Sequence, residues 1–176
     1  MSDRKLKVLT AVGADQPGLV KQISSLIHGS GANLEDSRMA ILGGEFALVL
    51  LYSGTQGALE QVQLGTSVLA SKLELQFVIK DTAIPAARPF RSYRLRVSGL
   101  DRPGIVECVT EVLEPRHVNV ESLDTRLAHM PLTGTPTFVL DAVLQIPPEV
   151  ALSELRRALS EQCDAEHLDY VLDARV

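Results

Sequence analysis

Aromatic residues are scarce: Phe and Tyr make up 4% of the 176 residues, and Trp is absent. Few side chains are therefore available to stack on nucleic-acid bases. A basic excess is also missing, because 17 Lys and Arg residues face 22 Asp and Glu residues and the formal net charge is −5. Duplex binding depends on clustered cations that displace counterions from phosphates. We therefore expect no direct binding to nucleic acid.

Long apolar segments are missing too. The longest apolar run, residues 46–52, has seven residues, whereas a membrane-spanning helix needs about 20. The N-terminus leads directly into a strand-like pattern with no apolar signal segment before it. We expect a cytoplasmic protein with no membrane partner.

Cysteine is rare, and the residues that bind metals are dispersed. Cys108 and Cys163 are too few for a disulfide framework, and their spacing fits no metal site. We expect two reduced thiols that are buried or half-buried. The histidines are scattered along the chain, at His28, His117, His129 and His167. A zinc site needs three or four convergent ligands, so we expect neither a metal nor another cofactor.

What the sequence does contain is an internal repeat. Residues 15–20 read Asp-Gln-Pro-Gly-Leu-Val, and residues 101–106, which lie 86 positions later, read Asp-Arg-Pro-Gly-Ile-Val. The Asn-Leu-Glu at 33–35 returns as Asn-Val-Glu at 119–121 with the same offset. The apolar residues between these anchors recur at helical spacing in both copies. Such agreement of turn, helix face and following Asn indicates a duplicated unit.

Both copies predict the same order of elements. Strands at 5–13 and 93–99 lead into the repeated turn, and Pro17 and Pro103 suit the first position of the following helix. A second strand begins at Asn33 or Asn119, and apolar third strands cover 46–51 and 138–143. A second helix follows, less clearly in the first copy because of Gly65, and the final strands are expected at 74–80 and 166–172. This order is βαββαβ twice, an α+β fold of two tandem ferredoxin-like units.

The two units are expected to be joined by a short linker. The stretch from residue 81 to 91 carries Pro85 and Pro89 and shows no periodicity. We place the first domain at 1–81, the linker at 82–91 and the second domain at 92–176. The Asn-to-Phe distance is 13 residues in the first copy and 19 in the second. The second copy should therefore have a longer connection between its second and third strands.

These motifs resemble those of the ACT domain, a small regulatory module that binds small molecules. The resemblance rests on a strand, Asp-x-Pro-Gly, a short amphipathic helix and a second strand beginning with Asn, and it covers nearly the whole chain. Residues 35–46 and 129–138 are further similar to segments of the glycine cleavage system transcriptional repressor family. That resemblance implies a tandem ACT protein without a catalytic or DNA-binding domain. It also implies that the protein senses an amino acid, with glycine the expected ligand, and acts through a partner transcription factor.

The repeated turn carries groups that suit a free amino acid. A helix N-terminus offers N–H donors and a favourable dipole to a carboxylate. We expect Gly18 and Gly104 in the first helical turn, where a missing side chain lets a ligand approach the backbone. Asp15 and Asp101 precede that helix and could accept from an ammonium group.

The repeated asparagines complete the expected site. Asn33 and Asn119 offer both donors and acceptors at the start of the neighbouring strand, so one turn and one strand end would hold both poles of a zwitterion. The resemblance implies ligand contacts at these same positions and at Pro17 and Pro103. The alternative stays open that the Asp side chains make only local turn hydrogen bonds and the glycines only permit close packing.

Other functions are weighed against this one. A regulatory subunit of an amino-acid metabolic enzyme would use the same fold on a different partner. A small ferredoxin-like hydrolase would need a phosphate cradle, and the carboxylates after Gly13 and Gly99 would repel a phosphate. We therefore expect a non-enzyme. One sheet face of each unit would lack helices, and pairing of the two units or of two chains would cover it. ACT units bind ligands at such interfaces, and that resemblance implies a homodimer or a larger assembly.

Overall fold

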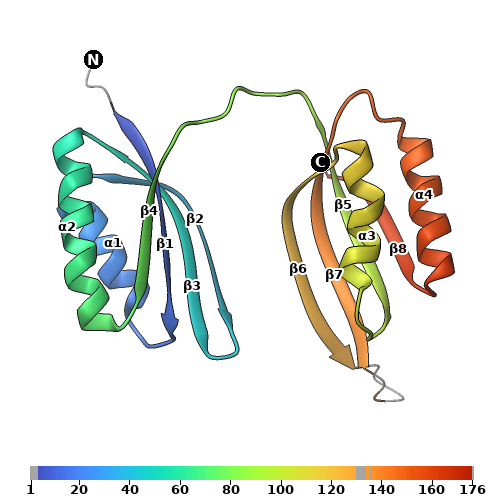
Figure 1. Ribbon diagram of the computed structural model, residues 1–176, viewed down its shortest axis with the longest axis horizontal. Helices are drawn as coiled ribbons and strands as arrows, with labels where there is room; N and C mark the ends of the chain where they lie inside the picture. Colours follow the sequence, from blue (N-terminus) through green and yellow to red (C-terminus); the bar gives the residue numbers. More distant parts are fainter. Residues whose placement is uncertain (1–3, 130–133, 135, 176) are drawn as a thin grey trace. The chain divides into compact units, whose positions relative to one another are not determined.

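The computed structural model describes residues 4–129, 134 and 136–175 (Figure 1). The chain divides into two compact units, Met1–Ala86 and Ala87–Val176. Each unit has its own four-stranded sheet and its own hydrophobic core. No regular secondary structure occurs from residue 83 to 90, between the last strand of the first unit and the first strand of the second.

The first unit alternates strands and helices in the expected order. Its elements are β1 (Lys5–Ala14), α1 (Leu19–Gly29), β2 (Asn33–Leu42), β3 (Glu45–Gly54), α2 (Gln56–Leu73) and β4 (Gln76–Thr82). The sheet order is β2-β3-β1-β4, and each neighbouring pair is antiparallel. Both helices cover one face of this sheet (Figure 1).

The second unit repeats this topology. Its elements are β5 (Arg91–Leu100), α3 (Ile105–Leu113) with a 3₁₀ turn at Glu114–Arg116, β6 (Asn119–His129), β7 (Pro136–Ile146), α4 (Leu152–Ala165) and β8 (Asp169–Ala174). The sheet order is β6-β7-β5-β8, again antiparallel throughout. The prediction of two tandem ferredoxin-like units is therefore confirmed. Residues 130–133 and 135, in the longer connection expected between β6 and β7, lie outside the described residues.

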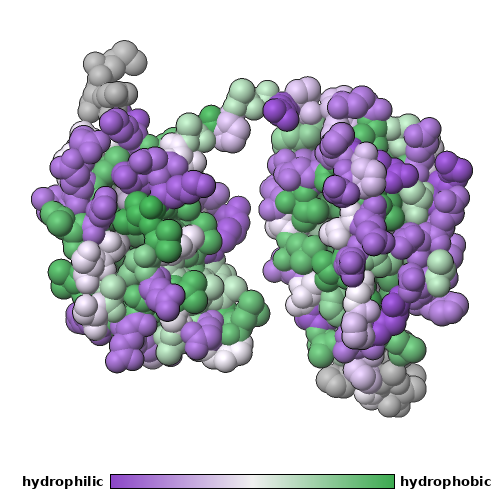
Figure 2. Space-filling model, in the orientation of Figure 1, coloured by the Kyte–Doolittle hydropathy of each residue, from purple (hydrophilic) through white to green (hydrophobic). Residues whose placement is uncertain are grey.

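The helical stripes of the repeat form the cores. Leu19, Ile23 and Ile27 of α1 are buried against the sheet, and α3 buries Ile105 and Val109 in the same way. Each helix therefore packs along the apolar face that the sequence predicted. Hydrophobic residues also reach the visible surface of the first unit (Figure 2).

Gly65 does not break the second helix of the first unit. A Cβ atom at Gly65 would lie 2.1 Å from Cδ1 of Leu26, so the glycine lets α1 pack closely on α2. The tight contact between the helices accounts for a residue that is unfavourable by propensity alone.

The expected starts of the final strands are wrong by two or three residues. β4 begins at Gln76 and β8 at Asp169. The residues before them end the preceding helices, and Glu74 and His167 adopt left-handed φ angles of 55° and 52°. A left-handed residue after a helix interrupts regular backbone hydrogen bonding, so the strands begin only after it. Within the described residues, no helix is long and apolar enough to cross a membrane.

Candidate ligand-binding turns

Gly18 and Gly104 hold the repeated turns in one conformation. Their φ and ψ angles are 95° and −1° for Gly18 and 93° and −2° for Gly104. These are the angles of the third residue of a type II turn, with Pro17 or Pro103 at the second position. The helices begin one residue later, so each glycine is an N-cap, and the prediction that the prolines occupy the first helical position is wrong.

The N-termini of α1 and α3 are open. A glycine N-cap provides no side-chain acceptor for the first helical N–H groups, and neither helix has a side-chain cap. Among the residues that the structure describes, no atom lies within 4 Å of the place that a Cβ at Gly18 or Gly104 would take. Unpaired N–H groups, a helix dipole and open space form a surface that accepts a carboxylate.

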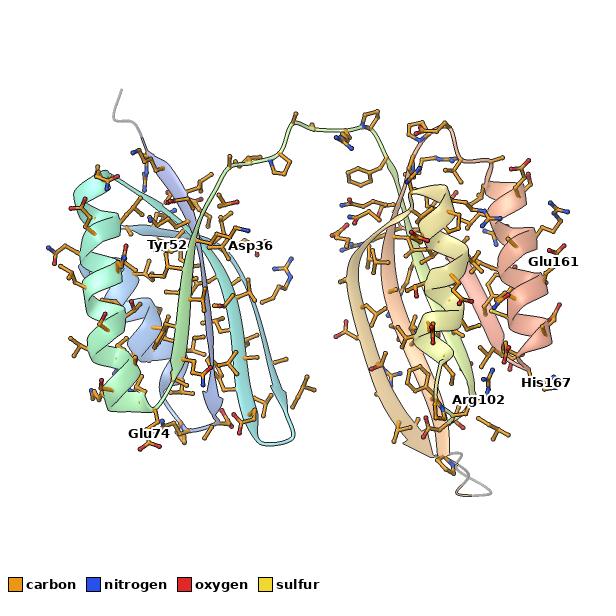
Figure 3. All side chains as sticks on the ribbon, viewed as in Figure 1. Asp36, Tyr52, Glu74, Arg102, Glu161 and His167 are labelled. Carbon is orange, nitrogen blue, oxygen red and sulfur yellow. The ribbon has the colours of Figure 1, made fainter. Side chains whose placement is uncertain are left out.

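The residue between Asp and Pro in the Asp-x-Pro-Gly motif differs between the copies. In both units it hydrogen-bonds the turn to the C-terminal end of the unit's second helix. Gln16 Nε2 donates to the main-chain oxygen of Leu73, at the end of α2, over 3.1 Å. In the second unit, the Arg102 guanidinium donates to the main-chain oxygen of Glu166 over 3.0 Å and pairs with the Glu166 carboxylate. Figure 3 labels Arg102 and His167 at this end of the unit. Sequence reasoning missed this role, although both variable residues are long side chains with N–H donors.

Asp15 and Asp101 are exposed at the ends of β1 and β5. Their main-chain N–H groups are used: Asp15 N donates to Gly44 O over 2.9 Å, and Asp101 N donates to Pro136 O over 3.5 Å. Among the described residues, neither carboxylate makes a hydrogen bond or an ion pair. The alternative that these side chains make local turn hydrogen bonds therefore has no support in the geometry.

Asn33 and Asn119 lie at the opposite ends of their sheets from the turns. Asn33 faces Ser53 of β3, which in turn faces Leu6 near the start of β1. Asp15 follows the other end of that ten-residue strand, roughly 30 Å away at about 3.3 Å per residue. Both β1 and β2 are antiparallel to β3, so they run in the same direction and their starts coincide.

The second unit shows the same separation. Asn119 faces Gln145 of β7, which faces Ser92 at the start of β5. The asparagines contact their own units: Asn33 Nδ2 donates to Glu35 Oε1 over 2.9 Å, and Asn119 Nδ2 donates to Gln145 Oε1 over 3.0 Å. The expectation that one turn and one strand end of the same unit meet is wrong.

Both ends of the second unit carry a surface depression. One, of about 430 Å³, is lined by Pro103, Gly104 and Phe138 among others. The other, of about 550 Å³, is lined by residues that include Phe90 and Asn119. Each predicted cluster of the second unit therefore borders open space of its own.

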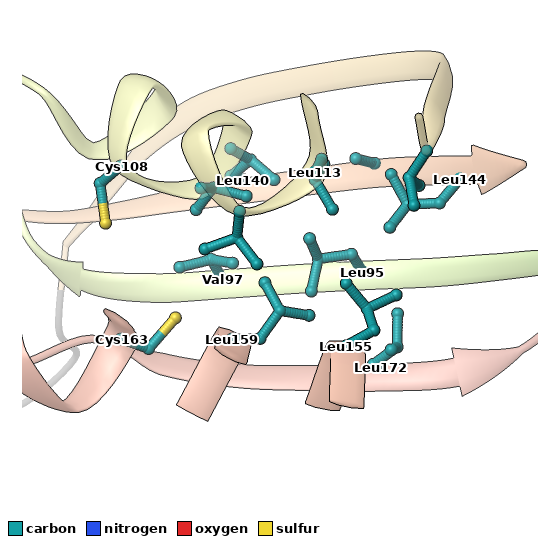
Figure 4. Packing of buried hydrophobic residues seen from close by; sticks show 14 of the residues in the cluster. Leu95, Val97, Cys108, Leu113, Leu140, Leu144, Leu155, Leu159, Cys163 and Leu172 are labelled. Atoms are coloured by element: carbon teal, nitrogen blue, oxygen red, sulfur yellow. The ribbon is translucent and has the colours of Figure 1, made fainter. Parts of the chain in front are cut away.

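The two thiols lie in the core of the second unit, apart from both depressions. Cys108 and Cys163 are buried (Figure 4). Burial raises the pKa of Cys108, and burial together with the nearby Cys108 raises the pKa of Cys163 to about 11. Both are therefore neutral thiols near pH 7. Among the described residues, no three or more His, Cys, Asp and Glu side chains are grouped so that they could hold a metal ion.

Comparison with known proteins places the chain in a family. Residues 6–80 match the model of the ACT domain. The glycine cleavage system transcriptional repressors of Escherichia coli (strain K12) and Shigella flexneri are each 33% identical over 127 residues, which is 72% of this chain and 67% of those proteins. The chain belongs to the glycine cleavage system transcriptional repressor family. It is an ACT-domain regulatory protein.

Solved structures share the whole two-unit fold. The crystal structure of an unknown protein from Galdieria sulphuraria is 28% identical and covers 99% of this chain and 100% of its own, with a TM-score of 0.82. The crystal structure of a candidate glycine cleavage system transcriptional repressor is 24% identical, with a TM-score of 0.74 and 98% of each chain covered. At this identity, the second comparison supports the tandem fold alone.

Proposed function

We propose that the protein is an amino-acid-responsive regulator that acts on gene expression through a partner transcription factor. The observation that carries the proposal is a turn with an open helix N-terminus and a carboxylate that has no partner among the described residues, present in both units of a member of this repressor family. Such a turn suits the two charges of an amino acid. Glycine is the first ligand to test, because the related repressors are named for the glycine cleavage system.

A complete site needs two units. The turn supplies N–H donors and the carboxylate of Asp15 or Asp101, but the amide of Asn33 or Asn119 lies roughly 30 Å from the turn of its own unit. We therefore propose that the amino acid lies where the turn of a unit in one chain meets the strand start of a unit in a second copy of the chain. This arrangement makes binding depend on association between units and supports the expected homodimer or larger assembly.

Calorimetric titration tests the binding proposal. The purified protein is titrated with glycine, then serine and a wider panel of amino acids. We expect saturable heat with glycine and a loss of at least about ten-fold in affinity when Asp15→Ala or Asp101→Ala removes the acceptor for the ammonium group. A folded protein that gives no heat with any amino acid would refute the proposal.

The partner is tested by capture from cells grown with and without glycine. A transcription factor that is retained with the wild type, and whose retention changes when glycine is added, is the expected result. Retention of an amino-acid metabolic enzyme instead would assign the same fold to enzyme regulation and contradict the proposed route to gene expression. Hydrolysis of an acyl phosphate by the protein would contradict the assignment as a regulator without catalytic activity.

A further inference from the structure

The two sheets present unlike surfaces on the side away from their helices. Because side chains alternate along a strand, the neighbours of the buried Leu9 and Ala11 point to this side in the first unit. We call it the first open face, and its central and edge strands contribute Val8, Val12, Ala47, Val49, Leu51 and Val78. Val12, Val49 and Val78 are 45%, 49% and 64% exposed, so this apolar surface has no cover within its own unit.

Charges on the first open face lie at its margins, on the edge strands and at the start of β3. Asp36 and Arg38 of β2 pair with each other, with 2.6 Å between Oδ1 and Nη1. Lys80 of β4 lies at the other edge, where it faces Val8 across the strands. Along the central strands β1 and β3, the middle positions on this side are uncharged: Val8, Thr10, Val12, Ala47, Val49 and Leu51. Glu45 also lies on this side, at the first position of β3, and therefore belongs to the rim. An apolar centre with a polar rim is the usual composition of a protein interface.

The second open face carries an ion network at the equivalent positions. Asp141 of β7 is the centre, with Arg96 Nε at 3.2 Å and Arg94 Nη2 at 3.1 Å from its Oδ1. Arg126 Nη1 lies 3.8 Å from its Oδ2. Strand pairing places Asp141 where the first unit has Val49, because Asp141 faces Arg96 as Val49 faces Thr10.

The first open face therefore needs an apolar partner with the same neutral centre. A charged surface such as the second open face is a poor complement, because its arginines and Asp141 would lose water without gaining partners. A second copy of the first open face, related by a two-fold axis, meets both requirements, because an isologous contact brings the apolar centre onto itself. The rim also complements itself, since it holds charges of both signs.

The size of the face fits such a contact. Four strands about 4.8 Å apart and up to ten residues long outline roughly 600 Å², and the side chains add accessible area beyond this outline. Stable interfaces bury about 800 Å² per partner. The face is thus large enough for a dimer of moderate strength.

We propose that two copies of this chain pair through their first open faces, with Val49 and Val78 in the buried contact. The pairing rests on the homodimer or larger assembly included in the proposed function, and it adds a contact distinct from the one that would bring a turn to a strand start. It involves neither the repeated turns nor the thiols.

Sedimentation of the full chain without ligand tests the pairing. The wild type is expected at twice 19.1 kDa at micromolar concentration. Val78→Asp should raise the dimer dissociation constant by at least about a hundred-fold, because it buries an unpaired carboxylate. Val171→Asp is the matched control: Val171 faces Arg96 as Val78 faces Thr10, and it is 52% exposed. It should leave the mass unchanged. Circular dichroism confirms folding of both variants, and Val49→Asp provides a second disruption at the centre of the face.

Three other outcomes would each overturn the proposed pairing. A monomeric wild type, or a dimer whose dissociation constant is unchanged by both Val78→Asp and Val49→Asp, overturns the proposed pairing. Loss of the dimer in Val171→Asp alone would assign the contact to the second unit and overturn it as well. Calorimetry with glycine is read separately, so a failure of the pairing is distinguished from a failure of amino-acid binding.

Discussion

The two units share their fold and their turns but differ in the use of the sheet face. Val8, Ala40 and Val49 of the first unit correspond through the repeat and the strand pairing to Arg94, Arg126 and Asp141 of the second. By contrast, the core positions Leu9 and Leu95 are the same residue and equally buried. The equivalent core positions Leu50 and Ala142 differ in size but are both apolar and buried. Core positions have therefore stayed apolar in both copies, whereas these open-face positions are apolar in the first unit and charged in the second. The fold therefore accommodates either kind of surface. We attribute the difference between the two open faces to the different partners that they contact.

The largest expected difference between the units concerns their thiols. Both cysteines belong to the second unit, and both are buried with raised pKa values. We expect iodoacetamide to label the native protein at least about a thousand-fold more slowly than the unfolded chain, because labelling requires the second unit to open. Labelling rates measured across a urea series then report on the second unit alone. Fast labelling of the native protein would show that a thiol reaches solvent without unfolding.

Gly13 and Gly99 occupy equivalent positions in the two units. Each lies close to the main chain just before the last strand of its unit. A Cβ at Gly13 would lie 2.9 Å from the main-chain oxygen of Glu74, and one at Gly99 would lie 3.3 Å from that of His167. Alanine at either position should destabilise its unit by about 1–3 kcal/mol, with the greater loss at Gly13 because its backbone contact is tighter. Urea unfolding measures both losses. Only Gly99→Ala should accelerate thiol labelling, and equal acceleration by Gly13→Ala would show that the units do not unfold separately.

The ion network predicts an acid-sensitive contribution in the second unit. Burial acts to raise the pKa of Asp141, but the hydrogen bonds and charges of Arg96 and Arg94 outweigh it, so the pKa lies below its ordinary value of 3.8. A lowered carboxyl pKa stabilises the folded state at pH values above the ordinary one, and this stability is lost as the pH falls through the lowered value. Asp141→Asn should therefore cost about 1 kcal/mol near neutral pH.

The difference between wild type and Asp141→Asn should shrink as the pH drops below 3.8. Urea unfolding at several pH values, with thiol labelling to follow the second unit, provides the measurement. Glu149→Gln is the control, since Glu149 is exposed and makes no hydrogen bond or ion pair with the described residues. A constant difference across the pH range would show that the charge of Asp141 does not stabilise the second unit.

The fold could be predicted from the sequence because its signals are local and occur twice. The Asp-x-Pro-Gly turn, the helical stripe and the following Asn lie within a stretch of 19 residues, and the repetition of this stretch indicated the order of the elements. Helix ends were predicted less well, because the left-handed conformations of Glu74 and His167 have no signature in residue type. The helix starting at Leu19 was placed two residues early, since a proline suits both a turn and a first helical position.

The candidate site could be predicted in its parts but not in its arrangement. The turn residues and the asparagines were found because they are repeated. The distance between them depends on the direction of the strands, which is not evident from their closeness in the sequence. The element order implied that direction, because a helix that returns from the end of β1 brings the start of β2 to the same end of the sheet as the start of β1. The contrast between the open faces was also readable in the alternation of Arg94 and Arg96 with apolar residues, where the first unit has Val8 and Thr10.

The pairing of first and last strands has a consequence for how such a protein can be assembled from modules. Leu6 faces Thr82 in the first unit, and Tyr93 faces Ala174 in the second, so both chain ends of each unit meet at the same edge. A unit whose ends meet can be copied in tandem, inserted into another protein or circularly permuted without rerouting its interior. The eight residues without regular structure between Thr82 and Arg91 are all that joining two such modules required here.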